Sequence, residues 1–149
     1  MEEADGQSNE DGKAGDLPKV METVLLVEDE PLVRWLRARV LRQQGYLVLE
    51  ASNGAEALSI AEEHADNGVH LLLTELMMPQ MGGRGLAGRI REIFPESRVI
   101  FTSGHGAEPA AKPFDTEPDN SIMQEPFEPE DVARMVREVL DAPQRGPQP

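Results

Sequence analysis

Short apolar runs alternate with helical patterns along most of the chain. The runs predict strands at 23–27, 46–50, 70–74, 98–102 and 121–123. Apolar residues recur at helical spacing from Pro31 to Gly45, from an Asn53 cap to about residue 65, before Pro95, and from Pro129 to about residue 141. Strands that alternate with helices form a parallel sheet through right-handed crossovers. The pattern therefore predicts a three-layer α/β domain around a five-stranded parallel sheet.

Polar side chains stand where four of these strands end. Glu28 and Asp29 follow the first strand, Glu75 the third, Ser103 the fourth and Glu125 the fifth. The carboxyl ends of parallel strands share one edge of the sheet, and ligands bind at that edge in open α/β sheets. We therefore expect these side chains to form one site.

Composition narrows the class of protein. The net charge of −14 argues against direct nucleic-acid binding, because phosphate contacts need clustered Lys and Arg. The sequence has no cysteine, no apolar run long enough for a membrane span and no signal-peptide pattern, so we expect a cytoplasmic protein without membrane contact. The chain is expected to contain one folded domain between two tails. We expect a disordered acidic tail at 1–20, a folded domain at 21–142 and a C-terminal tail at 143–149. Three prolines oppose a helix at 106–120.

Four blocks together resemble a known family. They are VLLVEDEP, LLLTELMMPQMGG, VIFTSGH and QEPFEPED, and in this order they resemble the receiver domain of bacterial two-component response regulators over about residues 22–142. The resemblance implies a flavodoxin-like sheet with strand order 2-1-3-4-5 and a non-enzymatic module of phosphorelay signalling. With few residues after position 141, we expect output by contact with a protein, either a sensor histidine kinase or a downstream signalling protein.

The resemblance also implies a metal site and a phosphoacceptor. The acid pair that holds Mg²⁺ in the family corresponds to Glu28 and Asp29, and the metal-binding carbonyl corresponds to Met77. The aspartate that accepts the phosphoryl group from a kinase histidine, and also contacts the metal, corresponds to Glu75.

Three further positions follow from the resemblance. The hydroxyl that contacts the phosphoryl group corresponds to Ser103, and the lysine that pairs with it corresponds to Glu125. Ile122 stands where the family often has an aromatic switch residue, which acts together with the hydroxyl position. Two central chemical positions, Glu75 and Glu125, thus depart from the pattern.

Both departures oppose phosphoryl transfer. Glutamate is longer than aspartate by one methylene, about 1.5 Å, and a misplacement of about 1 Å can cost on the order of a hundredfold in rate. Glu125 places an anion where the family has a cation. We therefore expect a module that works without phosphorylation at Glu75, and we expect repair to need Glu75→Asp and Glu125→Lys together. A slow phosphoacceptor is the alternative, and a metal-dependent phosphatase is a weaker one because the sequence lacks the Asp nucleophile and lysine of that group.

The same departures predict an unusual electrostatic pocket. If Glu28, Asp29, Glu75 and Glu125 lie about 6 Å apart, each like-charge pair costs roughly 3 kcal/mol at an effective dielectric of about 20. This corresponds to about two pKa units. The pocket should therefore either hold a hard cation, Mg²⁺ or alternatively Ca²⁺, or keep a proton. The alternative is that Glu125 turns into solvent and leaves an ordinary acidic cleft.

Overall fold

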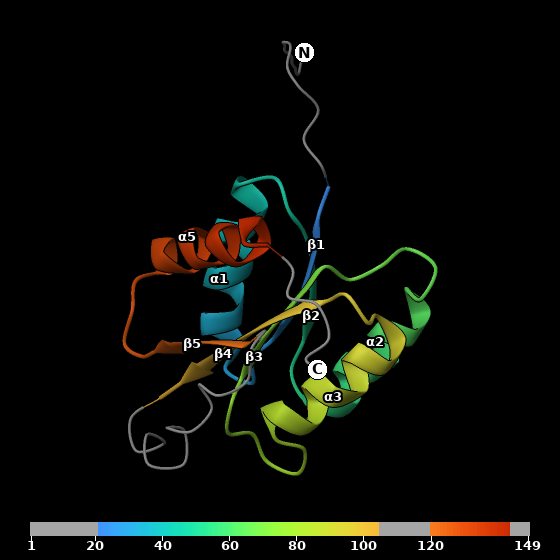
Figure 1. The fold of residues 1–149 in the computed structure, drawn as a ribbon. Helices are drawn as coiled ribbons and strands as arrows, with labels where there is room; N and C mark the ends of the chain where they lie inside the picture. Colours follow the sequence, from blue (N-terminus) through green and yellow to red (C-terminus); the bar gives the residue numbers. More distant parts are fainter. Residues whose placement is uncertain (1–20, 105–119, 144–149) are drawn as a thin grey trace, which may run out of the picture.

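A five-stranded parallel sheet forms the centre of the computed structural model, which describes residues 21–104 and 120–143. The strands lie in the order β2-β1-β3-β4-β5 (Figure 1). Their bounds are β1 Thr23–Val27, β2 Leu47–Ala51, β3 Leu71–Glu75, β4 Arg98–Ser103 and β5 Asn120–Gln124. The predicted fold class and strand order are confirmed. The predicted tail at 1–20, the segment 106–119 and residues 144–149 lie outside the described residues.

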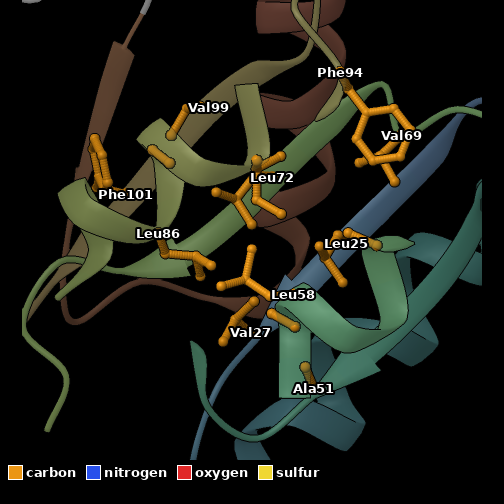
Figure 2. Close-up of a cluster of buried hydrophobic side chains, with 14 of the residues drawn as sticks. Leu25, Val27, Ala51, Leu58, Val69, Leu72, Leu86, Phe94, Val99 and Phe101 are labelled. Atoms are coloured by element: carbon orange, nitrogen blue, oxygen red, sulfur yellow. The ribbon is translucent and has the colours of Figure 1, made fainter. Parts of the chain in front are cut away.

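Helices cover both faces of the sheet. α1 Pro31–Gln43 and α5 Pro129–Asp141 pack on one face, and α2 Gly54–Glu63 and α3 Gly83–Ile93 pack on the other (Figure 1). Alternate residues of each strand supply the two cores, since successive side chains point to opposite faces. Leu25 and Leu72 face α2 and α3 (Figure 2), whereas Leu26 and Leu73 face α1 and α5.

Several element ends differ from the predicted ones by one or two residues. β2 and β3 begin and end one residue later than predicted, and β4 and β5 are longer. The reason is register: Glu75 pairs with Thr102, and Ser103 pairs with Gln124, so the ladder continues past the apolar runs. Glu75 is therefore the last residue of β3, and its backbone is held by the sheet.

Gly83 sets the distance between α3 and the end of β3. A Cβ atom at this position would lie 2.3 Å from the carbonyl oxygen of Glu75 and 3.0 Å from the Cα atom of Leu76. Both are backbone atoms of the strand end and cannot rotate away. The absence of a side chain at Gly83 thus allows α3 to approach the strand that carries Glu75.

We expect Gly83→Ala to lower the free energy of unfolding by about 3 kcal/mol, because overpacking against backbone forces the helix and strand apart. Gly88→Ala in the same helix is the matched control: nothing lies within 4 Å of its added Cβ, so helix propensity should raise stability by about 0.5–1 kcal/mol. Urea unfolding followed by circular dichroism measures both. Equal stability of the two variants would show that the close approach is relaxed at no cost.

Candidate functional site

Three glutamates meet at the carboxyl edge of the sheet. Glu28 directly follows β1, Glu75 ends β3 and Glu125 directly follows β5. One carboxylate oxygen from each lies within 4.8 Å of the others. Glu28 is only 2% exposed, whereas Glu75 and Glu125 are partly buried. The edge therefore concentrates carboxylates, as expected from the strand ends, and Glu125 points into the pocket instead of into solvent.

Asp29 and Met77 lie at the margin of this cluster. Asp29 is exposed, and its carboxylate does not belong to the converging group that Glu28, Glu75 and Glu125 form. Its negative charge nevertheless helps to raise the pKa of Glu75. Met77 lies in the loop after β3, with 58% of the residue exposed. The role implied for Met77 belongs to its backbone carbonyl and stays a prediction.

A buried arginine from α1 enters the pocket. Arg37 Nη1 lies 3.0 Å from Glu28 Oε1, and Nη2 lies 3.1 Å from Glu125 Oε2. The residue is 8% exposed, and its guanidinium carbon stands 4.7 Å from the centre of the Phe127 ring. Arg37 therefore joins the ends of β1 and β5 through one rigid fork.

Sequence reasoning missed Arg37, although the chain carried a signal for it. Arg37 stands four residues after Val33 and four before Leu41, both members of the apolar stripe predicted for this helix. A charged residue on an inward stripe needs a buried partner.

Hydrogen bonds hold both the side chain and the backbone carbonyl of Glu28. Its second carboxylate oxygen, Oε2, accepts a hydrogen bond from the Glu30 N–H at 3.2 Å. Arg34 Nη1 donates to the Glu28 carbonyl at 2.7 Å. Because the Glu30 side chain also caps the first turn of α1, accepting from the Leu32 N–H, the helix start and the acid are one unit.

Glu75 keeps a proton in this environment. Burial, then the hydrogen bond with Glu28, then the charges of Glu28, Asp29 and Glu125 together raise the pKa of Glu75 to about 9. Protonated Glu75 donates to the Glu28 carboxylate. Burial also raises the pKa of Glu28, and the hydrogen bonds from Glu75 and Glu30 and the charge of Arg37 oppose that rise. Of the two outcomes expected for the pocket, the raised pKa of Glu75 favours a held proton.

Of the two expected switch positions, Ser103 contacts the backbone of Glu125, and Ile122 packs against a hydrophobic core cluster. Ser103 is 1% exposed at the end of β4, and its Oγ atom has no hydrogen-bond partner among the described residues. Its carbonyl accepts from the Glu125 N–H at 2.8 Å, which fixes the start of the loop after β5. Ile122 is partly buried and packs with the core cluster that contains Phe101. The side chain at this position is therefore aliphatic, and its equivalence to the family aromatic stays a prediction.

A model of the response regulator receiver domain matches residues 24–137. The chain belongs to this family. Sensor kinase CckA of Brucella abortus (strain 2308) is 36% identical over 119 residues, which are 80% of this chain and 12% of the kinase. Response regulator receiver protein CpdR of the same strain is 32% identical over 122 residues, 82% of this chain and 99% of CpdR. The chain is therefore a receiver domain of two-component signalling.

Solved receivers share the fold. The receiver domain of the hybrid histidine kinase CckA gives a TM-score of 0.66 at 34% identity and covers 80% of this chain and 99% of that one. A response regulator receiver protein from Sinorhizobium medicae WSM419 gives a TM-score of 0.70 at 28% identity and covers 82% of this chain and 96% of that one.

Across residues 21–104 and 120–143, no helix has the length and apolar character that crossing a bilayer requires.

Glu28 and Glu75, two of the four expected metal positions, lie in a carboxylate cluster whose third member is Glu125, and carboxylate oxygens are donors that Mg²⁺ and Ca²⁺ prefer. Two of its three carboxylates, however, are ion-paired with Arg37, and burial raises the pKa of the third, Glu75. This arrangement does not fit a divalent ion while Arg37 stays in place. Metal binding at the cluster stays a prediction.

Proposed function

We propose that this receiver works in phosphorelay signalling without phosphorylation at Glu75. It is a non-enzymatic, cytoplasmic module that spans about residues 21–142 and acts by protein contact. The observation that carries the proposal is the Arg37 fork between Glu28 and Glu125, beside Glu75, whose pKa is raised to about 9 by burial and by the neighbouring acids. The pocket already contains its own cation, and the raised pKa of Glu75 favours a proton there.

In this proposal, each functional position of the receiver family has an equivalent residue in this chain, and some of these residues differ in chemistry from those of the family. Glu75 is the equivalent of the phosphoacceptor, and Ser103 and Glu125 are the equivalents of the residues that contact the phosphoryl group. Ser103 and Ile122 are the equivalents of the switch pair. The metal positions correspond to Glu28, Asp29, Glu75 and the Met77 carbonyl, with Mg²⁺ or Ca²⁺ as the ligand that Arg37 opposes.

The chemistry supports inactivity at Glu75. A carboxyl group attacks phosphorus as the anion, and a neutral acid is a poor nucleophile. Glu125 adds a second obstacle, because its carboxylate would repel an incoming phosphoryl group that carries the same sign of charge. The extra methylene of Glu75 is a third obstacle, since in-line transfer depends on position within about 1 Å.

The exposed apolar surface near the pocket supports contact with a protein partner. Leu32, Trp35 and Leu36 on α1 are 63%, 52% and 36% exposed. Large apolar side chains that gather on one helix face mark contact surfaces more often than isolated ones do. A sensor histidine kinase or a downstream signalling protein is the proposed partner class, and the net charge of −14 disfavours nucleic acid.

The test is an intact-mass measurement after incubation with a small acyl phosphate donor and Mg²⁺. We expect no phosphorylated species in the wild-type protein, with Glu75→Gln as the matched control for the position. A phosphorylated mass that appears in the wild type and disappears in Glu75→Gln would instead establish the slow phosphoacceptor.

A further inference from the structure

Arg37 is built into the pocket more firmly than an incidental ion pair. Each of its two terminal nitrogens contacts a carboxylate from a different strand end, at 3.0 Å for Glu28 and 3.1 Å for Glu125. A planar guanidinium suits this double contact, because its donors form a fixed fork. A lysine ammonium would supply only a point charge.

The surroundings of Arg37 also hold the guanidinium in place. Its face lies on the Phe127 ring at 4.7 Å, a cation–π contact from the segment that links β5 to α5. The Arg37 side chain is 9% exposed, so its stem is buried along α1. Both carboxylate oxygens of Glu28 are already engaged, Oε1 by the Arg37 guanidinium and Oε2 by the Glu30 N–H.

We propose that Arg37 is the resident cation of this receiver and occupies a latent divalent-metal site, so that Arg37 and not a metal holds Glu28 and Glu125 together. The inference rests on the proposed function only in taking the pocket as unphosphorylated. Arg37 is here a positioning residue: it neutralises the two carboxylates and fixes the ends of β1 and β5 relative to each other.

The pocket remains reachable for ions once the guanidinium is removed. The Glu125 side chain is 30% exposed, and a cleft of about 270 Å³ opens beside it, lined by Val33, Leu36 and Phe127 among others. Without Arg37, three glutamates with oxygens inside 4.8 Å would lose the guanidinium that pairs with two of them. Oxygen donors at this spacing are what Mg²⁺, Ca²⁺ and Mn²⁺ require.

The test compares metal-dependent thermal stability of the wild type and Arg37→Met, without a phosphoryl donor. We expect the wild-type Tm to stay unchanged in about 10 mM Mg²⁺ or Ca²⁺, whereas Arg37→Met should have a lower Tm that metal raises by roughly 5 °C or more. Arg39→Met removes the same charge from the same helix outside the cluster and should respond to metal as the wild type does. Glu28→Gln added to Arg37→Met should abolish the metal response.

Arg37→Lys keeps the test decisive if Arg37→Met does not fold. Lysine retains the charge but engages one carboxylate at a time, so we expect a metal response between those of the wild type and Arg37→Met. Direct titration of the wild type with Mn²⁺, followed by electron paramagnetic resonance, is the second measurement, and we expect no site tighter than about millimolar.

A metal response in the wild type that equals or exceeds that of the Arg37 variants would overturn the inference. A sub-millimolar Mn²⁺ site in the wild type that Glu28→Gln removes would overturn it too. Neither result bears on phosphorylation, which the mass measurement decides by itself. A wild type that is phosphorylated yet insensitive to metal alone would refute the proposed function and leave the role of Arg37 standing.

Discussion

Phosphoryl transfer to position 75 is expected to increase at least about a hundredfold when Glu75→Asp, Glu125→Lys and Arg37→Met are combined. Glu75→Asp shortens the acceptor by one methylene, and Glu125→Lys supplies a cation for the phosphoryl group. Arg37→Met is required as well, because a lysine at position 125 would otherwise face the guanidinium that now lies 3.1 Å from the Glu125 carboxylate. The structure thus adds a third change to the two that the sequence indicates.

The three repairs should be strongly non-additive, since they act on one transition state. Intact-mass measurement after treatment with an acyl phosphate donor and Mg²⁺ compares the wild type, the single variants, the double variant Glu75→Asp with Glu125→Lys, and the triple variant. A triple variant with Glu75→Asn in place of Glu75→Asp is the control and should stay unmodified. If the double variant is modified as fully as the triple one, Arg37 is no obstacle to the reaction.

Glu75→Gln is expected to stabilise the protein at pH 8 and to change little at pH 4. The folded protein holds the Glu75 pKa at about 9, against an ordinary value of 4.5, so the unfolded chain releases this proton at a much lower pH. The stabilisation that Glu75 contributes is therefore fully present below about pH 4.5 and is lost as the pH rises towards 9. Glutamine cannot ionise, and its amide can donate to Glu28 as the protonated acid does.

At pH 8 we expect a gain of about 2 kcal/mol in the free energy of unfolding, a value kept below the full linkage limit because Glu75 is only partly buried. Urea unfolding at pH 5 and pH 8 measures the difference. Glu62→Gln makes the same substitution at an exposed position of α2 and serves as the control. A gain for Glu75→Gln that does not grow between the two pH values would show that Glu75 is ionised in the folded protein.

The sequence by itself determined the fold and the edge of the sheet where the site lies. Strand runs and helical stripes have different periods, so their alternation specifies a parallel α/β sheet without any knowledge of contacts. Glu28, Glu75 and Glu125 were placed at strand ends for the same reason, and they do converge. Element ends were less well defined, because the ladder between Ser103 and Gln124 depends on neighbours and not on the apolar run.

Only the tertiary structure decided how the pocket is neutralised. Arg37 and Glu125 are 88 residues apart in sequence, and their contact depends on how α1 and the loop after β5 pack against the sheet. The pKa of Glu75 has the same origin, since burial and three neighbouring acids, Glu28 and Asp29 after β1 and Glu125 after β5, raise it. Charge of this density had to be balanced, which the sequence indicated. The identity of the balancing groups, the Arg37 cation and the Glu75 proton, depends on distances between side chains from separate segments. Such distances are set only in the folded chain.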